Sequence, residues 1–312
     1  MTSRAAFRQL PFEALPEAPR LPHGYATARA VTTPVASAAF GTLDTHYRTL
    51  GSGPPLLLVH GLMTSSYSWR YVIGPLAKEF TVYAPDLPGS GRTEKPAVSY
   101  HPDRVADWIA DFQRAVGIRG CATIGNSLGG YLCMRLALRD PSAMRRLVNL
   151  HSPGVPLARL ALLHAVLSVP GSSTLLAWLV TRDPERWVHR NVHYHDETLK
   201  SREETREYAA ALVSPGGLGA FARTLRETLD PAAMRQFVGD LAARRDRGEP
   251  FPIPLELVYV PRDPMVPPQV GERLRALIPD AEFVRLADAS HFAHVDAPER
   301  FLEAVRPFLA GR

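Results

Sequence analysis

The stretch Ile124-Gly125-Asn126-Ser127-Leu128-Gly129-Gly130 places one serine between glycines, where an apolar run gives way to a helical pattern. A Gly-x-Ser-x-Gly pattern is weak by itself, because a chain of this length contains one by chance about once in ten. A nucleophilic serine on a tight strand-to-helix turn requires small residues two positions before and after it, since strand and helix pass closely there. Gly125 and Gly129 meet this requirement. The rest of the sequence has to decide whether Ser127 is a nucleophile.

Short apolar runs, typical of buried parallel strands, alternate with helical patterns on both sides of this stretch. Strand-like sequence lies between 27 and 50, and further strands are expected at 56–59, 81–84, 121–124, 147–150, 255–260 and 283–286. Helices are expected at 68–78, 103–117, 128–139, 269–277 and 298–309. This order predicts an α/β protein with a doubly wound, mostly parallel sheet.

The alternation is interrupted by a long helical stretch. Residues 153–248 are rich in arginine and are broken by prolines and glycines, and we interpret them as a helical cap. The cap would be inserted into one core domain formed by 27–152 and 249–312, above the carboxyl ends of the strands, where open α/β sheets bind ligands. Residues 1–26 are rich in proline without periodicity, which predicts an N-terminal arm that lies over the surface or is partly disordered.

Composition excludes several function classes. The chain has 46% hydrophobic and 21% charged residues, as folded globular proteins do. Its formal charge is +5, but the basic residues are not clustered, so we expect no nucleic-acid partner. The apolar region 155–180 is broken by His164 and Pro170-Gly171, so we expect no membrane span. The N-terminus lacks the apolar stretch of a secretory signal, which favours a cytoplasmic protein.

Three residues can form a nucleophilic site. A serine hydroxyl needs a base within hydrogen-bond reach and a third group that orients this base. Asp263 follows the expected strand 255–260, and His291 follows the expected strand 283–286. Both would lie beside Ser127, past the carboxyl ends of parallel strands, and the order serine, acid, histidine is typical of one sheet topology among serine hydrolases.

Two backbone N–H groups are candidates for stabilising an oxyanion. The helix that begins at Leu128 would direct its first N–H groups and its dipole at the serine, which favours developing negative charge. The loop after strand 56–59 should supply the second donor, because Gly61 permits a close approach. The N–H of Leu62 is the natural candidate there.

These residues belong to a set of stretches that together resemble the α/β-hydrolase fold superfamily, in the right order from about residue 40 to the end of the chain, the cap excluded. The stretches are His60–Trp69, Asp86–Gly91, Gly125–Gly130, Arg262–Pro267 and Ser290–Pro298. The resemblance implies Ser127 as nucleophile, His291 as general base and acid, Asp263 as orienting acid, and Leu62 and Leu128 as oxyanion donors. We also expect Met63 and Trp69, in the first stretch, to contact the substrate.

Departures from related patterns narrow the chemistry. The stretch after His60-Gly61 resembles haloalkane dehalogenases, which use an aspartate nucleophile, a halide-binding Asn after His-Gly and a Trp after the nucleophile. This chain has Ser127, Leu62 and Leu128 at those positions, which argues against dehalogenation, and the missing aspartate also argues against epoxide hydrolysis. Gly-Asn-Ser-x-Gly-Gly resembles hydrolases that cleave carbon–carbon bonds in ring-fission products, but their glycine-rich loop is replaced here by Leu-Met-Thr-Ser-Ser.

Other acids and histidines in the sequence are either alternatives for the site or have structural roles. Asp288 is the alternative acid and His294 the alternative base. His60 is expected to brace the oxyanion loop and Asp86 to tie down its own turn. The cap histidines, which include an i, i+4 pair at His189 and His193, lack the glutamate of a metalloprotease helix, so we expect no metal site.

The sequence therefore predicts a cofactor-independent serine hydrolase acting on a small, largely apolar ester, lactone or related acyl compound. Carbon–carbon bond hydrolysis and acyl transfer to an acceptor other than water stay open as alternatives. Outside enzymes, the same fold could serve as a ligand receptor. The partner is expected to be a small molecule, and a homodimer stays open.

Overall fold

A mixed sheet forms the centre of the computed structural model, which describes residues 6–311. Its eight strands have the order β1-β2-β4-β3-β5-β6-β7-β8. The strands are β1 (Arg29–Ser37), β2 (Gly41–Leu50), β3 (Pro55–Val59), β4 (Thr81–Pro85), β5 (Cys121–Asn126), β6 (Met144–Leu150), β7 (Leu255–Tyr259) and β8 (Glu282–Arg285). β1 pairs antiparallel with β2, and β2 with β4, while all other neighbours are parallel. The predicted α/β class with a mostly parallel sheet is confirmed.

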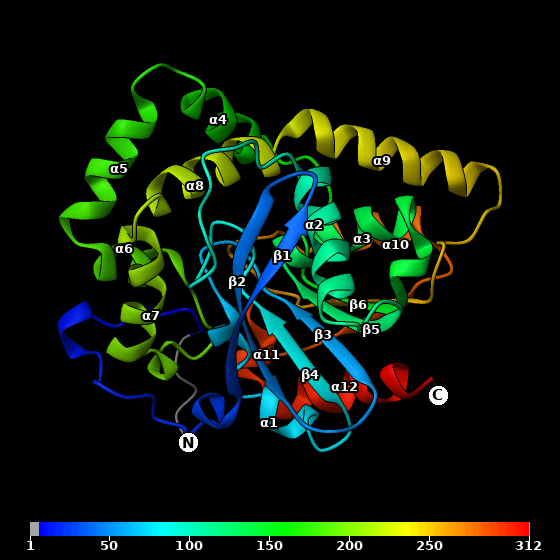
Figure 1. The fold of residues 1–312 in the computed structure, drawn as a ribbon, viewed down its shortest axis with the longest axis horizontal. Helices are drawn as coiled ribbons and strands as arrows, with labels where there is room; N and C mark the ends of the chain where they lie inside the picture. The colour runs from blue at the N-terminus through cyan, green and yellow to red at the C-terminus, as the bar shows by residue number, and fades with distance from the viewer. Residues whose placement is uncertain (1–5, 312) are drawn as a thin grey trace.

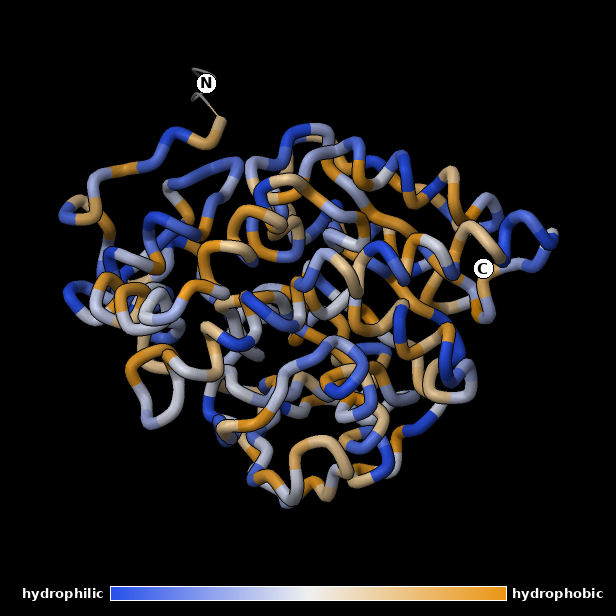
Figure 2. Tube along the Cα trace, turned by 90° about the horizontal axis from the view of Figure 1, so that it is seen from above, coloured by the Kyte–Doolittle hydropathy of each residue, from blue (hydrophilic) through white to orange (hydrophobic). Residues whose placement is uncertain are grey.

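Helices cover both faces of this sheet (Figure 1). Successive strand side chains point to opposite faces. In β3, Leu57 and Val59 therefore join the core under α2 (Pro102–Ala115), α3 (Leu128–Arg139) and α10 (Gln269–Leu277), while Leu56 and Leu58 join a second core. The second core packs against α1 (Ile73–Leu76), α11 (Ala293–Asp296) and α12 (Pro298–Ala310). Figure 2 shows hydrophobic stretches running through the middle of the molecule.

The prediction of one helix over 68–78 is wrong in its extent. The structure has a 3-10 turn, η3 (Ser66–Trp69), followed by the single turn of α1. Pro75 has no N–H to donate, and Gly74 before it is a poor helix former, so a continuous helix is not favoured there. The other short turns are η1 (Phe12–Ala14), η2 (Tyr25–Thr27), η4 (Pro141–Ala143) and η5 (Glu197–Leu199).

Residues 153–248, here called the cap segment, contain helices and no strand. These helices are α4 (Ala158–Leu167), α5 (Ser172–Arg182), α6 (Pro184–Asn191), α7 (Arg202–Val213), α8 (Gly217–Arg223), the π-helical turn η6 (Thr224–Thr228) and α9 (Pro231–Asp246). They lie along the top and left of the molecule in Figure 1. Within residues 6–311 no single helix is long and apolar enough to cross a membrane; α4 and α5 together reach that length and composition, but they are bent by 102°.

The N-terminal arm packs on the cap segment over its described part, residues 6–26. The N–H of Phe7 donates to the carbonyl of His195 at 3.1 Å, and the N–H of Arg202 donates to the carbonyl of Pro16 at 2.8 Å. The guanidinium of Arg202 also lies 3.6 Å from the centre of the Phe12 ring. The arm is therefore ordered by contacts with residues far away in the sequence, which its own composition could not indicate. Residues 1–5 of the expected arm lie outside the described residues.

The sheet also contains a buried carboxyl group that should make stability depend on pH. Glu256 in β7 is 2% exposed and lies opposite Glu282 of β8. Burial, with a smaller effect of Glu282, raises the pKa of Glu256 from 4.5 to about 8. The folded state therefore binds this proton more tightly than the unfolded state, so the free energy of unfolding should fall as the pH rises from 4.5 toward 8.

We expect Glu256→Gln to increase the free energy of unfolding by about 2 kcal/mol at pH 8, because an amide does not ionise and so places no charge in the buried site. At pH 4.5 the substitution should change the free energy of unfolding little. Urea unfolding at the two pH values measures the difference. Glu282→Gln is the control, and it should have a smaller effect. A gain of equal size at both pH values would contradict this account.

Candidate active site

Ser127 occupies a strained turn between β5 and α3. Its backbone has φ 53° and ψ −120°, a combination that residues other than glycine rarely adopt and that is kept only where the surroundings enforce it. Two hydrogen bonds enforce it here: the N–H of Ser127 donates to the carbonyl of Leu150 at 2.8 Å, and the N–H of Tyr131 donates to the carbonyl of Ser127 at 3.1 Å. The turn presents the side chain of Ser127 at the carboxyl end of β5.

The glycines on either side of the serine are required by contact distances. A Cβ atom at Gly129 would lie 2.3 Å from the carbonyl oxygen of Val59, and one at Gly125 would lie 2.7 Å from Cα of Gly130. Both distances are far below van der Waals contact. The prediction that these positions must be small is confirmed, and the reason is the close passage of α3 over β3 and β5.

Asp263 and His291 lie together, as predicted. Nδ1 of His291 donates to Oδ2 of Asp263 at 2.7 Å, and both side chains are almost fully buried. Burial alone would raise the pKa of Asp263, but the imidazoles of His291 and His151 hold it well below its usual range, so the carboxyl group is charged. Because Nδ1 is engaged, Nε2 is the nitrogen of His291 that can exchange a proton with a group in the site.

A second histidine contacts the same carboxylate, and the sequence reasoning missed it. Nδ1 of His151, in the residue after β6, lies 3.0 Å from Oδ2 of Asp263. Nε2 of His151 accepts a hydrogen bond from the N–H of Val260 at 2.9 Å, so in the neutral ring the proton is on Nδ1, the nitrogen on the side of the carboxylate. Burial lowers the pKa of His151, which favours this neutral form. The sequence contained a signal for this histidine, because His151 follows the expected strand 147–150 at the sheet edge where Asp263 and His291 were also expected.

Replacing His151 with glutamine should lower kcat for an ester substrate about tenfold with little change in KM. The change removes the imidazole that lies 3.0 Å from Oδ2 of Asp263 and the acceptor for the N–H of Val260, and a hydrogen bond of this kind contributes about 0.5–1.5 kcal/mol. Steady-state kinetics measure the effect, and a thermal melt checks that the fold is intact. A rise in KM alone would show that His151 contributes to binding and not to the orientation of His291.

The residues His151, Asp263 and His291 are also of the types that bind metals, and their facing atoms lie within 4.8 Å of one another. The hydrogen bonds explain this arrangement without an ion. Nδ1 of His291 carries a proton toward Oδ2 of Asp263, and the other ring nitrogen of His151, Nε2, is occupied by the N–H of Val260. The cluster therefore orients His291.

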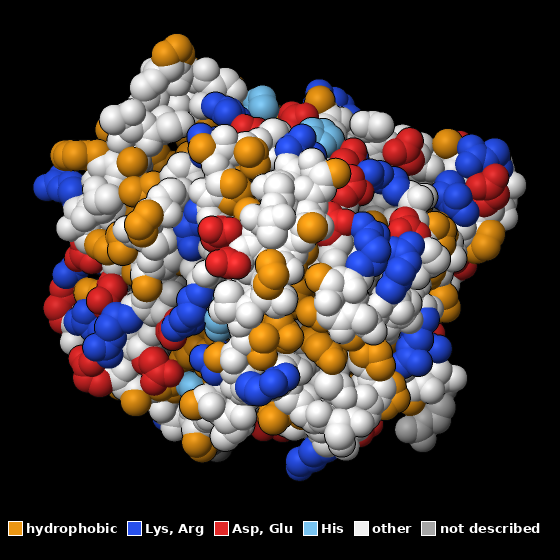
Figure 3. Space-filling model, viewed as in Figure 1, with side chains coloured by type: hydrophobic (Ala, Val, Ile, Leu, Met, Phe, Trp, Pro, Cys, Tyr) orange, Lys and Arg blue, Asp and Glu red, His pale blue; other side chains and the backbone are white. Residues whose placement is uncertain are grey.

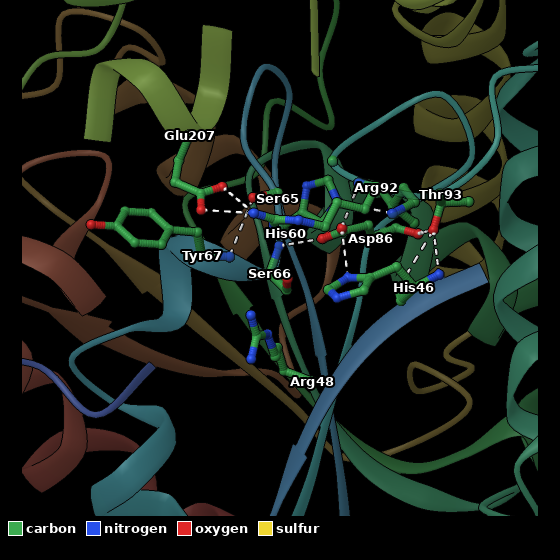
Figure 4. Close-up of polar contacts among 12 residues, drawn as sticks. His46, Arg48, His60, Ser65, Ser66, Tyr67, Asp86, Arg92, Thr93 and Glu207 are labelled. Atoms are coloured by element: carbon green, nitrogen blue, oxygen red, sulfur yellow. Dashed lines mark hydrogen bonds and ion pairs between the residues drawn. The ribbon is translucent and has the colours of Figure 1, made fainter. Parts of the chain in front are cut away.

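The loop that holds Leu62 is fixed by a buried polar network (Figure 4). Nδ1 of His60 donates to the carbonyl of Gly61 at 2.8 Å, and its Nε2 accepts from the N–H of Leu87 at 2.9 Å. Asp86 accepts from the N–H of Ser66 at 2.7 Å and from Nδ1 of His46 at 3.0 Å. Burial opposes its charge, but the hydrogen bond from His46 and the nearby imidazole of His60 lower the pKa of Asp86 to about 2. The structural roles expected for His60 and Asp86 are confirmed.

The N–H groups proposed to bind an oxyanion have no acceptor in the described part of the chain. Neither Leu62 nor Leu128 donates its N–H to another group among residues 6–311. Gly61, next to Leu62, packs against Ser127, since a Cβ atom at Gly61 would lie 3.0 Å from Cβ of Ser127. Met63 adopts φ 62°, so the loop turns sharply after Leu62.

Ser127 and His291 open into one cavity of about 430 Å³, a size typical of small-molecule sites. The core contributes Leu62, Leu128, Pro264, Met265, Val266 and Phe292, and the cap segment contributes Pro153, Leu157, Leu160, Leu163, Leu225 and Leu229. The lining is thus mostly apolar. Its polar groups besides Ser127 and His291 are Arg159, Asn191 and His193.

The two residues expected to contact substrate lie elsewhere. Trp69 is fully buried and its ring packs 4.4 Å from that of His294, outside the cavity lining. Trp69 ends the short turn η3 instead of lying on a continuous helix, and this turn directs it into the second core. Met63 lines a much smaller neighbouring pocket together with Tyr208 and Phe221.

The alternative acid and base are also placed by the structure. The side chain of Asp288 is 69% exposed and lies near His195, while Asp263 is completely buried against His291. His294 is completely buried, and burial holds its pKa well below the usual value. Nε2 of His189 donates to the carbonyl of Leu10 on the arm at 2.9 Å. None of these three residues lines the cavity.

A family model described as the alpha/beta hydrolase fold matches residues 54–298. This match covers most of the chain and contains the elbow, the acid and the histidine. The chain belongs to the α/β-hydrolase fold family.

Several members of the family are similar to this chain. The 2-hydroxymuconate semialdehyde hydrolase of Pseudomonas sp. strain CF600 is 28% identical over 272 residues, covering 86% of this chain and 91% of the relative. The epoxide hydrolase CorEH has a TM-score of 0.75 at 22% identity, covering 91% of this chain and 100% of that one. A thermophilic esterase from Thermogutta terrifontis has a TM-score of 0.71 at 22% identity, covering 91% and 99%. At these identities, the two solved structures support the fold alone.

Proposed function

We propose that the protein is a serine hydrolase that cleaves a small, largely apolar ester, lactone or related acyl substrate through an acyl-enzyme. The observation that carries the proposal is the strained Ser127 in one cavity with His291, whose Nδ1 is engaged by the charged, buried Asp263. This is the combination of nucleophile, base and orienting acid that activates a serine hydroxyl. The apolar lining suits an acyl chain or a ring.

In the proposed reaction, Oγ of Ser127 attacks the substrate carbonyl while Nε2 of His291 takes its proton. The N–H groups of Leu62 and Leu128 stabilise the resulting oxyanion, a contribution of typically 10²–10³ in turnover for each donor. His291 then protonates the leaving group as the carbon–oxygen bond breaks. A water molecule attacks the acyl-enzyme, gives its proton to His291, and releases the acid and Ser127.

Serine at position 127 separates this proposal from the chemistry named for other members of the family. Epoxide hydrolysis and dehalogenation use a carboxylate nucleophile, and position 127 offers a hydroxyl group. The likeness to the epoxide hydrolase CorEH is therefore a likeness of fold. Leucines at 62 and 128 also offer no side-chain donor for a halide.

Carbon–carbon bond hydrolysis is the second candidate. It is favoured by the similarity to 2-hydroxymuconate semialdehyde hydrolase and by Arg159, which lines the cavity and can pair with an acidic substrate. The guanidinium of Arg159 is held by the carbonyl of Pro264 at 3.1 Å. The decay of a coloured vinylogous diketone acid, compared with the turnover of a p-nitrophenyl ester, decides between the two bond types.

A fluorophosphonate probe tests the proposal directly. We expect rapid labelling at Ser127, mapped by peptide mass spectrometry, because an activated serine reacts with phosphorus electrophiles. Ser127→Ala should abolish labelling, while Ser152→Ala, which removes a buried serine outside the cavity lining, should leave it intact. Tight binding of small acyl compounds without any labelling would instead favour a ligand receptor on this fold.

A further inference from the structure

The outer side of the pair α4–α5 is apolar and exposed. Of the eight large hydrophobic side chains that are exposed in residues 6–311, six belong to this pair and its connecting loop. They are Leu162 (67% exposed), Val166 (51%), Val169 (60%), Leu175 (58%), Trp178 (53%) and Leu179 (44%). Figure 3 shows hydrophobic side chains over the corner where Figure 1 places α5. Such a concentration indicates an interaction surface.

Helix α4 is apolar on two sides. Leu160 and Leu163 line the cavity of the proposed site, while Leu162 and Val166 are exposed on the outer side. A surface helix normally has one apolar stripe and a polar opposite face. The second apolar side of α4 therefore needs a second apolar environment, and α5 extends the same surface around a bend of 102°.

The charged side chains within α4, α5 and their connecting loop are of one sign. Residues 158–182 contain no aspartate or glutamate, and their charged residues are Arg159 and Arg182. The guanidinium of Arg182 lies 4.7 Å from the centre of the exposed Trp178 ring. The first acid beyond α5, Asp183, is paired with Arg186 at 2.9 Å. An apolar surface with an amphipathic Trp and Arg182 beside it matches the interface of an anionic bilayer.

The size of the surface is at the lower limit for an interface with a second copy of the chain. At these exposures, and with about 150–250 Å² for a whole bulky side chain, the six residues present on the order of 600 Å². A stable protein–protein interface of standard size buries about 600–1,000 Å² per partner. Taken together, α4 and α5 also have the length and composition of a membrane-spanning segment, which favours a lipid environment over a second copy of the chain.

We propose that the outer face of α4–α5 docks on an anionic lipid bilayer. Trp178, Leu175 and Leu162 enter the region between headgroups and acyl chains, and Arg182 faces the lipid phosphates. Because α4 also lines the cavity, docking would place the site next to apolar substrates dissolved in the membrane. This role in substrate access rests on the proposed hydrolase function.

Vesicle flotation tests the docking. The whole protein should bind vesicles of phosphatidylglycerol and phosphatidylcholine at low salt, and more weakly vesicles of phosphatidylcholine alone or at high salt, because salt screens Arg182. Tryptophan emission should shift to the blue, since Trp178 is exposed while Trp69 and Trp108 are fully buried. The double variant Leu175→Ser/Trp178→Ser should bind at least tenfold more weakly. The matched control is Val213→Ser, which removes a 51% exposed apolar side chain on α7 and should bind normally.

Three results would overturn the proposal: no binding to either vesicle, equal binding by the double variant, or a dimer in sedimentation that the double variant loses. Turnover of a short, water-soluble ester separates this proposal from the proposed function. The double variant should keep that turnover, and Ser127→Ala should lose it while still binding vesicles.

Discussion

Replacing Asp263 with asparagine is expected to lower the turnover of a p-nitrophenyl ester about 10⁴-fold while the fold is kept. The carboxylate accepts from the N–H of Met265 at Oδ1, at 2.6 Å, and from Nδ1 of His291 at Oδ2, and Nδ1 of His151 lies 3.0 Å from the same Oδ2. Asparagine has only one acceptor oxygen, so its NH₂ group must face one of these donors. It also cannot stabilise the imidazolium that forms on His291 during the reaction. Steady-state kinetics and a thermal melt measure both quantities.

Asp288→Asn is the matched control for this prediction. Asp288 follows β8, the strand that also precedes His291, and is the alternative acid by sequence. Its side chain is 69% exposed, however, and contacts neither His291 nor the cavity. We expect its replacement to leave turnover unchanged. If Asp288→Asn lost activity and Asp263→Asn kept it, the assignment of the acid would be wrong.

Removing the charge of Glu204 should reduce the free energy of unfolding by about 3–5 kcal/mol, a fall in Tm on the order of 10 °C. Glu204 on α7 of the cap segment forms an ion pair with Arg70 of the core, and both side chains are almost completely buried. Tyr194 also donates its hydroxyl to Glu204 at 2.8 Å. Glu204→Gln would leave the Arg70 guanidinium without a counter-charge in a site that water does not reach.

Urea unfolding and thermal melts measure this loss. The control is Glu249→Gln, which breaks the exposed pair with Arg247 and should cause no measurable change, because exposed ion pairs contribute little. Since the buried pair joins the core to the cap segment, the Glu204→Gln variant should also be cleaved by trypsin within residues 153–248 before the core. An unchanged Tm would mean that this contact between core and cap is dispensable.

Much of the site could be predicted because its determinants are local. Gly125 and Gly129 are required by the passage of one helix over neighbouring strands, and the acid and the histidine each follow a strand of the same sheet. Parallel strands bring their carboxyl ends to one edge, so residues at these ends meet even when they are far apart in the sequence. This is why Asp263 could be chosen, and the structure places it 2.7 Å from His291.

Other features depended on contacts that no local pattern records. Trp69 is turned into the core because the helix expected around it is broken, and Met63 lines a separate pocket. His151 reaches Asp263 only because β6 and β7 are neighbours although the whole cap segment separates them in sequence. The arm is likewise ordered by the cap segment on which it lies.

The sequence by itself determined the sheet, the strained serine turn and the order of nucleophile, acid and base, because each depends on residue type at fixed distances from a strand. Only the tertiary structure decided the second imidazole on Asp263, the lining of the cavity and the apolar outer face of α4–α5. Those features arise where side chains from distant segments are buried together or left exposed, and burial is a property of the packed chain.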